Sequence, residues 1–172
     1  MEHVYKGIDL DFGHNLARGG GKGLPKHLHG LVDFCDDHIM PNHTVLELGC
    51  FEGASTKVFS HFASRVITVD INFNRVDKAS MGENVEFIQC SSLNVFEILE
   101  AKQIEYDVLY IDTVHSEQHC IKELESLHKY CRTDPKIIGG HDYSFAGIKK
   151  AIEYFFGRSP DKIYSDDSWV YC

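Results

Sequence analysis

The chain has 172 residues and a net charge of −9 at neutral pH, with 43% hydrophobic and 25% charged residues. This is the size of one ordinary domain, and no apolar run approaches the roughly 20 residues that a membrane-spanning helix needs. Nucleic-acid partners are bound through clusters of basic residues, which this acidic chain lacks. We therefore predict a single domain over residues 1–172 that binds neither membranes nor nucleic acid.

Two further features predict a cytoplasmic location. The first fifteen residues lack the basic start and apolar core of a signal peptide. The cysteines show no C-x-x-C pair and no even spacing, which favours reduced thiols over a disulfide framework or a zinc site. They are Cys35, Cys50, Cys90, Cys120, Cys131 and Cys172.

The first thirty residues differ from the rest, because the stretch ARGGGKGLPKHLHG holds five glycines and a proline. Such a composition is typical of a loop. We predict that residues 1–30 form a mobile segment, either a disordered leader or a flap over a ligand site. A helix is expected from Leu24 to about Ile39, ending before Pro41.

After Pro41, strand-like and helix-like segments alternate, which predicts βαβ units and a parallel sheet covered on both faces. Strands are expected at Thr44–Leu48, Val66–Asp70, Val85–Gln89, Asp107–Ile111 and Lys136–Gly139, and helices at Ala54–Phe62, Val95–Ala101, Ser116–Tyr130 and Gly147–Phe156. Two short strand-like runs around Ser165–Ser168 predict an antiparallel hairpin over residues 161–172. The expected fold is Rossmann-like α/β, a mostly parallel sheet of about seven strands with a core over residues 44–156.

Ligands of such open sheets bind beyond the carboxyl ends of the strands, and the stretch VLELGCFEGAST follows the first strand end. Gly49 and Gly53 let the backbone turn sharply and approach a ligand. The helix start offers N–H groups to a carboxylate, and Glu47 suits a cationic amine. Together they predict an amino-acid tail, such as that of S-adenosylmethionine (SAM), although a tight turn without ligand has the same pattern. The dinucleotide fingerprint is absent, since Phe51 and Ala54 replace two of its glycines.

The next two strand ends complete a candidate nucleoside site. Asp70 ends the second strand, about 20 residues after the glycine turn, where a carboxylate can accept both ribose hydroxyls. Ser91 and Ser92 follow the third strand and would lie near an adenine ring. For Ser91, a contact with the base and a helix cap are equally open.

The fourth strand ends in Asp112, and His115 follows in the loop. An acid at this position points into the site, while His115 is either a substrate contact or a helix-start residue. His115 and His119 are four residues apart, but the absence of an H-E-x-x-H pattern argues against zinc there.

The fifth strand leads into Gly139 and Gly140, followed by His141 and Asp142. We expect the glycines to clear space for a ligand. Asp112, His141 and Asp142 come from neighbouring strand ends and could converge on one divalent cation. Alternatively His141 acts as a base, or the His141–Asp142 pair is purely structural.

Taken in order, E-L-G-C-F-E-G-A-S-T, V-D-I-N, Y-D-V-L-Y-I-D-T-V-H-S and G-G-H-D-Y resemble class I SAM-dependent methyltransferases. The strongest resemblance is to the methyltransferase 24 family, related to catechol-type O-methyltransferases, and it runs from about Thr44 to Phe156. It implies that the methionine moiety lies among Glu47, Gly49, Gly53 and Ser55. The full set of residues expected around the cofactor is Glu47, Gly49, Cys50, Phe51, Gly53, Ser55, Asp70, Ile71, Ser91, Ser92 and Asp112.

The sequence departs from the catechol-type pattern at three places. In those relatives an acid matching Asp112 and an acid–amide pair bind magnesium, whereas here the pair is His141–Asp142. A nitrogen ligand fits manganese or iron better than magnesium. The usual aspartate at the adenine position is Ser91, and the usual aromatic residue after the histidine is Glu117, which leaves the substrate open.

The leading hypothesis is an enzyme that transfers the SAM methyl group to an oxygen of a small hydroxylated acceptor. Asp112, His115 and His141 form its expected catalytic group, with a divalent metal (Mg, Mn or Fe) on Asp112, His141 and Asp142. The alternative is a SAM- or nucleoside-binding protein without transferase activity. A nicotinamide dehydrogenase is disfavoured by the missing glycines. A protein or nucleic-acid methyltransferase remains an alternative, although the amino-methylation signature N-P-P-[YF] is absent and the net charge is unfavourable. The sequence is also compatible with a homodimer.

Overall fold

A computed structural model of the chain describes residues 4–10, 28–131 and 135–172. Its centre is a seven-stranded sheet with the strand order β5-β4-β3-β6-β7-β9-β8. The strands are β3 (Thr44–Leu48), β4 (Arg65–Asp70), β5 (Val85–Gln89), β6 (Val108–Ile111), β7 (Ile137–Gly140), β8 (Lys162–Ile163) and β9 (Trp169–Tyr171).

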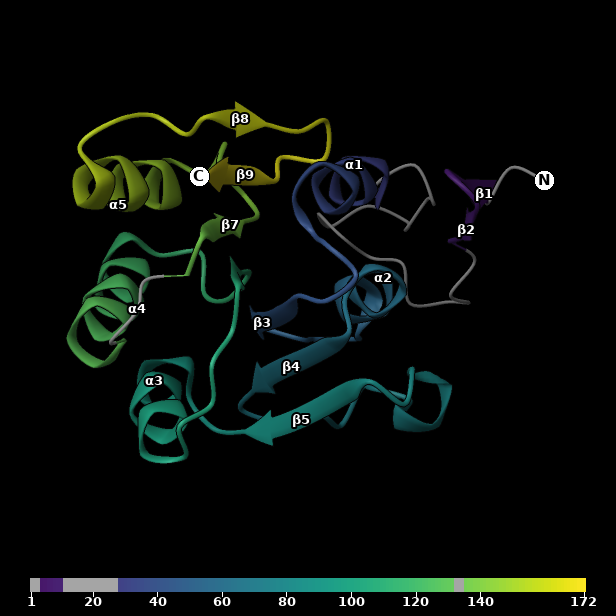
Figure 1. The fold of residues 1–172 in the computed structure, drawn as a ribbon. Coiled ribbons are helices and arrows are strands. Elements are labelled where there is room, and N and C mark those ends of the chain that lie inside the picture. The colour runs from purple at the N-terminus through teal and green to yellow at the C-terminus, as the bar shows by residue number, and fades with distance from the viewer. Residues whose placement is uncertain (1–3, 11–27, 132–134) are drawn as a thin grey trace.

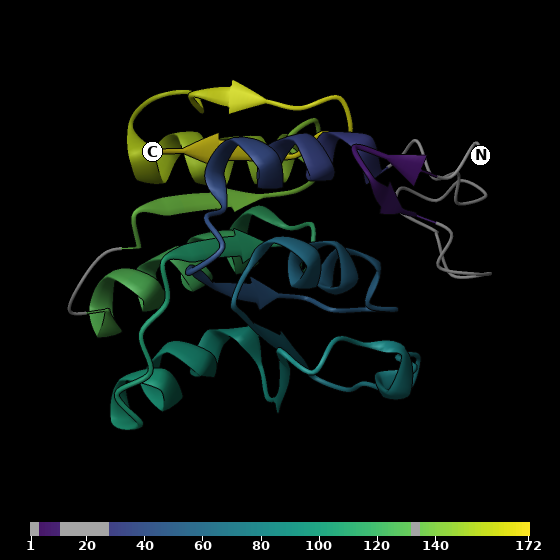
Figure 2. The ribbon, with the colours of Figure 1, turned by 45° about the vertical axis from the view of Figure 1, so that its right-hand side comes forward.

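The five strands β3 to β7 are parallel, and their carboxyl ends lie along one edge of the sheet (Figure 2). Strand β9 pairs antiparallel with β7, and β8 pairs antiparallel with β9. The predicted mostly parallel sheet with a C-terminal antiparallel hairpin is therefore confirmed. The strand order reverses between β3 and β6, and ligands of open α/β sheets bind at such a reversal.

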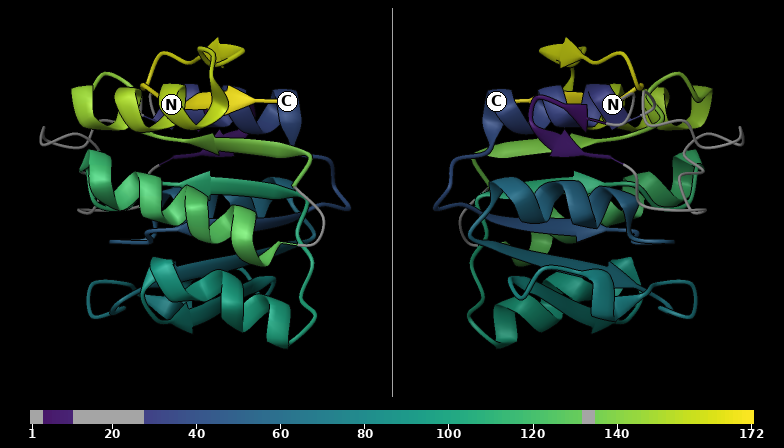
Figure 3. Two further views of the ribbon diagram at one scale, coloured as in Figure 1. Left: turned by 90° about the vertical axis from the view of Figure 1, so that its left-hand side faces the viewer. Right: turned by 90° about the vertical axis from the view of Figure 1, so that its right-hand side faces the viewer.

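Helices cover both faces of the sheet. Helices α1 (His29–His38) and α2 (Ala54–Phe62) lie on one face, and α3 (Ser92–Ala101), α4 (Glu117–Tyr130) and α5 (Ala146–Phe156) lie on the other (Figures 1 and 3). The short 3₁₀ helix η2 (Lys78–Ser80) precedes β5. Helix α5 is an example of how these helices pack, since it buries Ile148, Ala151 and Ile152 at helical spacing. Gly157 ends the helix at a φ of +67°.

The strands of the sheet contribute to two apolar cores, one on each face. Val45 of β3 packs in the core beneath α1 and α2, whereas Leu46 and Leu48 pack in the core beneath α3, α4 and α5. This alternation follows from the two-residue period of a strand. Burial on both faces explains why the sequence of β3 reads as an apolar run, each fully buried leucine contributing about 1.5–3 kcal/mol to folding.

The boundaries of the central elements agree closely with those expected. Helix α2 begins and ends at the predicted residues, and α3 begins three residues early because Ser91 caps it. The predicted helix Leu24–Ile39 is seen as α1 from His29, while residues 24–27 lie outside the described part. All six cysteines are free thiols, as expected. Within the described residues no helix has the length and apolar character needed to cross a membrane.

A small N-terminal hairpin was not expected from the sequence. It consists of β1 (Val4–Tyr5) and β2 (Ile8–Asp9), joined by Lys6 and Gly7 at positive φ. The Tyr5 ring stacks on His29 with ring centroids 3.9 Å apart, and Lys6 forms ion pairs with Asp33 and Asp36 of α1. Residues 4–10 of the predicted mobile segment are therefore held against α1. The glycine-rich stretch, and with it the flap hypothesis, lies outside the described residues.

Candidate functional site

The turn after β3 is shaped by two glycines in the left-handed region, Gly49 at a φ of +91° and Gly53 at +83°. A Cβ on Gly49 would lie 1.9 Å from the backbone oxygen of Asp112, at the end of β6. A Cβ on Gly53 would lie 2.2 Å from the terminal methyl of Met81. The neighbouring strand end therefore requires a glycine at position 49, and the expected approach of a ligand to this turn stays a prediction.

Asp70 ties the end of β4 to this turn. Its Oδ2 atom accepts hydrogen bonds from the backbone N–H groups of Cys50 and Phe51, both at 3.0 Å, and Oδ1 accepts one from Asn72 at 3.2 Å. The side chains of Phe51 and Ile71 are exposed next to it. The carboxylate thus lies where a ribose-binding acid was expected, and it also fixes the turn itself.

Glu47 lies beneath the turn and is fully buried. Its carboxylate accepts hydrogen bonds from the hydroxyls of Ser55 and Thr56 in α2, and from Thr68 of β4 at 2.7 Å. Burial raises the pKa of Glu47 to about 7, and the three hydroxyls offset part of that rise. The expected direct contact between Glu47 and a ligand amine is therefore wrong for this conformation, because the carboxylate has no exposed surface.

The two serines after β5 have different environments. Ser91 is the N-cap of α3, where its hydroxyl accepts a hydrogen bond from the N–H of Leu93 at 3.3 Å. Of the two interpretations left open for Ser91, the structure shows the helix cap. Ser92 is buried, and its hydroxyl lies 3.2 Å from Nε2 of His119 in α4.

The residues expected around the cofactor follow β5, β4, β3 and β6, which are adjacent in the sheet. They therefore form a continuous row along the carboxyl edge, and the turn holding Gly49 and Gly53 lies at the switch point. The helix start at Ala54 directs backbone N–H groups to the same edge.

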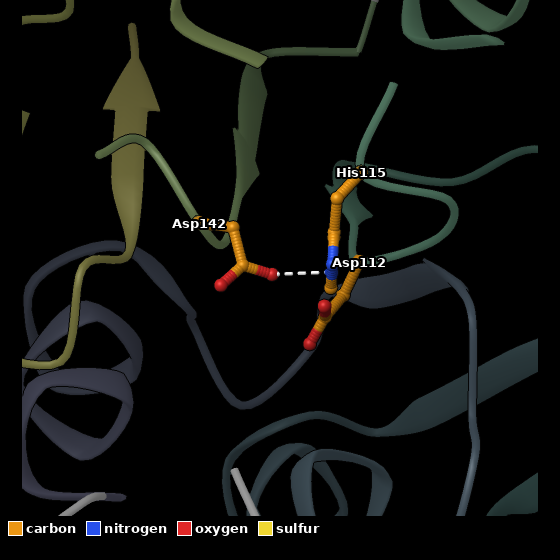
Figure 4. A group of neighbouring side chains, drawn as sticks. All are labelled: Asp112, His115 and Asp142. Carbon is orange, nitrogen blue, oxygen red and sulfur yellow. Dashed lines mark ion pairs between the residues drawn. The ribbon is translucent and has the colours of Figure 1, made fainter. Parts of the chain in front are cut away.

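A second group of polar side chains lies next to this row. Asp112 and His115 follow β6, and Asp142 follows β7 (Figure 4). Their potential ligand atoms all lie within 4.8 Å of one another, and His115 Nε2 is 2.6 Å from Asp142 Oδ2. Two carboxylates and one imidazole suit a divalent cation, and the nitrogen donor favours manganese or iron over magnesium.

His141 does not belong to this group. Its Nδ1 lies 3.0 Å from Asp142 Oδ1, and the ring is buried. Its Nε2 is buried as well and has no hydrogen-bond partner within the described residues. The expectation that His141 is a cation ligand or the base is therefore corrected. The His141 ring contacts the other oxygen of Asp142, and the more exposed His115 lies in the cluster where His141 was expected.

Asp142 has a φ of +61°, a conformation that costs a residue other than glycine about 1–3 kcal/mol. The neighbouring backbone is held by Asp167 of the β8–β9 turn, whose carboxylate accepts a hydrogen bond from the N–H of Ser144 at 2.9 Å and from its hydroxyl. These contacts fix the backbone that follows Asp142.

The glycine pair before His141 serves packing. A Cβ on Gly139 would lie 2.6 Å from Cε2 of Phe34, and one on Gly140 would lie 2.6 Å from Cζ2 of Trp169. The expectation that these glycines clear space for a ligand is therefore wrong, because the space is filled by Phe34 and Trp169.

Sequence reasoning missed several polar residues that support the site. Thr113 directs its hydroxyl to Glu123, which is fully buried in α4, and Thr68 does the same for Glu47. A signal for Glu123 exists in the sequence, since it shares one face of α4 with the buried Cys120, Leu124 and Leu127. An acid on the apolar face of a helix requires a buried partner.

Comparisons with known proteins place this geometry in context. The family model described as a methyltransferase domain (methyltransferase 24) matches residues 46–143. No curated protein matches the sequence. Among solved structures, a Streptococcus mutans protein assigned as a SAM-dependent methyltransferase has a TM-score of 0.60 and 16% identity, over 81% of this chain and 42% of its own.

Two further solved structures are similar. SMU.776, assigned as a methyltransferase and solved with SAH, has a TM-score of 0.63 and 14% identity over 84% of this chain and 48% of its own. An rRNA methylase from Streptococcus thermophilus has a TM-score of 0.56 and 12% identity over 83% of this chain and 92% of its own. At these identities the likeness shows the fold alone. The chain spans less than half the length of the first two.

Proposed function

The chain belongs to the methyltransferase-domain family whose model matches residues 46–143, and on this basis we propose that it transfers the methyl group of SAM to an oxygen of a small hydroxylated acceptor. One observation carries the proposal. The turn expected to hold the cofactor lies at one edge of the sheet, next to the cluster of Asp112, His115 and Asp142. Gly49 of that turn lies directly against the backbone of Asp112.

We propose that SAM lies along the row from β5 to β6. The N–H groups at the start of α2 suit the methionine carboxylate. Asp70 suits the ribose, and Ile71 and Ser92 flank the expected place of the adenine. Glu47 supports the turn from below and does not reach the ligand. This arrangement would leave the sulfonium near Asp112.

The proposed reaction is a direct displacement. A lone pair of the acceptor oxygen forms a bond to the methyl carbon, the carbon–sulfur bond breaks, and its electron pair stays on sulfur to give SAH. The hydroxyl proton must leave to a base in or near the site. His115 suits this role, because Asp142 occupies its Nε2 and thereby leaves Nδ1 to accept the proton. The remaining contribution of the chain is alignment of the acceptor.

The same cluster fits a divalent cation by the chemistry of its donors. Asp112, His115 and Asp142 would hold it, and His141 would orient Asp142 from behind. Such a cation, when bound, lowers the pKa of a nearby hydroxyl and orients it.

The first measurement is the binding of SAH to the purified protein, by calorimetric titration in the presence and absence of Mn²⁺. The second measurement is the formation of SAH from SAM with small hydroxylated acceptors. We expect SAH binding, and turnover that falls in His115→Ala with SAH affinity retained. A protein that binds neither SAM nor SAH contradicts the proposal.

Two other functions are each suggested by one observation. A SAM-binding protein without transferase activity is supported by the His115–Asp142 contact, which satisfies both groups without a substrate. It would bind SAH and form no product. An RNA acceptor is suggested by the fold shared with the rRNA methylase, but a net charge of −9 disfavours it. The cytoplasmic location, the homodimer and the single-domain extent stay predictions.

A further inference from the structure

A buried carboxylate lies beneath the turn that carries Asp112 and His115. Glu123 of α4 has no exposed surface, although it faces the end of β6 where the turn begins. A buried acid is strongly destabilising unless hydrogen bonds satisfy its oxygens. The partners of Glu123 therefore indicate what the residue is there to hold.

The first partner is Thr113, the residue directly after Asp112. Its hydroxyl lies 2.8 Å from one carboxylate oxygen of Glu123 and 2.9 Å from the other. The hydroxyl thus fixes the turn between Asp112 and His115 to the interior of α4. At the start of the same turn, the N–H of Asp112 donates to the carbonyl of Leu48 at 2.8 Å.

The second partner is His119, whose Nε2 lies 3.1 Å from Oε1 of Glu123 and 3.2 Å from the hydroxyl of Ser92. Both contacts use the same ring nitrogen. This excludes a relay of the Ser–His–acid type, in which the two partners bind different nitrogens. Hydrogen bonds therefore converge on the Glu123 carboxylate. Together they connect the start of α3, the turn after β6 and helix α4.

The other half of the cluster is anchored independently. Asp142 is held by Nδ1 of His141 at 3.0 Å, and Asp167 accepts hydrogen bonds from the neighbouring Ser144. Neither anchor contacts Glu123 by any bond seen among the described residues. The two halves of the cluster therefore have separate anchors, and they meet in the contact between His115 Nε2 and Asp142 Oδ2.

We propose that Glu123 is a positioning residue, which sets the turn of Asp112 and His115 at ligand distance from Asp142 through the hydroxyl of Thr113. The inference rests on the proposed function only for what the cluster does, since the anchoring itself is a property of the folded chain. It assigns a role to a residue that touches neither cofactor nor acceptor.

Three variants test the proposal. Thr113→Val removes the hydroxyl with little change of shape, and Thr113→Ser keeps it. The matched control is Ser126→Ala, which removes another hydrogen bond between α4 and its surroundings, from the Ser126 hydroxyl to the carbonyl of Leu93 at 3.0 Å. Thermal unfolding first establishes that each variant folds. If Thr113→Val does not fold, Glu123→Gln replaces it, since the amide retains one acceptor oxygen.

The first measurement is amide hydrogen exchange over residues 112–116, which needs no ligand. We expect exchange at least about tenfold faster in Thr113→Val than in the wild type, as a lost local hydrogen bond of about 1.5 kcal/mol implies. Thr113→Ser and Ser126→Ala should match the wild type there. With Glu123→Gln in its place, we expect a smaller acceleration. Unchanged exchange in the variant that lacks the native contact overturns the proposal.

The second measurement is the affinity for Mn²⁺, by calorimetry. Removing a group that orients a metal ligand typically weakens the metal affinity by about 10–100-fold, so we expect a loss in that range for Thr113→Val and rescue by Thr113→Ser. A wild-type protein that does not bind Mn²⁺ contradicts the cation part of the proposed function, and the exchange measurement still decides the role of Glu123. Mn²⁺ bound equally by wild type and Thr113→Val overturns the positioning role.

Discussion

The backbone oxygen of Asp112 lies 1.9 Å from the point that a Cβ on Gly49 would occupy. The strand ends of β3 and β6 thus touch where the glycine turn of residues 49–53 begins, and no side chain fits between them. The sequence pattern identified this glycine correctly as special but attributed it to a ligand. A glycine is required at this position because the backbone of the neighbouring strand β6 leaves no room for a Cβ.

Gly49→Ala should therefore destabilise the fold more than Gly53→Ala. Both positions have positive φ, but the new methyl group at Gly49 meets backbone, whereas at Gly53 it meets the flexible end of Met81. We expect an added loss of about 1–3 kcal/mol at Gly49 from overpacking. Urea unfolding of the two variants measures the difference. Equal losses would show that the strand end moves aside without strain.

The titration of Glu47 predicts a pH dependence of stability. Its pKa is about 7 in the folded protein and near 4.5 in the unfolded chain. The folded state therefore holds the proton more tightly, and this stabilisation is complete below pH 4.5 and is lost as the pH rises through 7. The loss amounts to at most about 3 kcal/mol.

Glu47→Gln cannot titrate, so its free energy of unfolding should fall less between pH 5 and pH 8 than that of the wild type. Urea unfolding at both pH values gives the comparison, and the other titrating groups cancel in the difference. Parallel curves for the two proteins would mean that Glu47 stays charged when folded.

Asp70→Ala should weaken SAH binding in calorimetry. The carboxylate is expected to bind the ribose, and it also fixes the N–H groups of Cys50 and Phe51. Loss of one charge-assisted hydrogen bond, about 1.5–3 kcal/mol, corresponds to roughly 10–100-fold in affinity. Asp77→Ala is the matched control, because it removes a carboxylate that caps η2 by accepting a hydrogen bond from the N–H of Ala79. Equal SAH affinity in a folded Asp70→Ala protein would remove Asp70 from the site.

His115→Ala should lose Mn²⁺ affinity by more than tenfold, since it removes one of three donors from the cluster. His128→Ala, an exposed histidine on α4, is the control for a general loss of imidazole. His141→Ala should show a smaller loss, because His141 acts only through Asp142. Calorimetry with Mn²⁺ ranks the three variants. A larger loss for His141→Ala than for His115→Ala would restore the histidine first expected as ligand.

The central elements were predictable because their signals are local. The apolar run of β3 and the helical spacing of α2 are set by residues close together in the chain, and both have the expected bounds. The hairpin of β1 and β2 was missed because strands of two residues carry no periodicity. It is stabilised by contacts of Tyr5 and Lys6 with α1, nearly thirty residues away.

The positions of the candidate residues were predictable, and the directions of their side chains less so. Asp70, Asp112 and Asp142 lie at the carboxyl ends of strands, as the sequence pattern predicts, and their binding of a ligand stays a prediction. Side-chain direction depends on contacts from distant segments. Such contacts determine that His115, and not His141, lies in the cluster with Asp112 and Asp142. The positive φ of Asp142 and the hydrogen bond from Trp169 to the carbonyl of His141 turn the His141 ring inward. No local pattern in G-G-H-D-Y contains that information.

The reversal of strand order between β3 and β6 divides the candidate site between two stretches of chain that can be separated. Residues up to β5 contain the glycine turn and Asp70, and residues from β6 contain Asp112, His115 and Asp142. Between them lies an exposed connection at Lys102 and Gln103, the kind of segment that tolerates cleavage. A chain cut there yields one fragment with most of the residues expected around the cofactor and another with the cluster of Asp112, His115 and Asp142, and we expect neither fragment to be active alone. Recovery of SAH formation on mixing the two would report their reassociation, which makes this fold suited to a split-protein sensor.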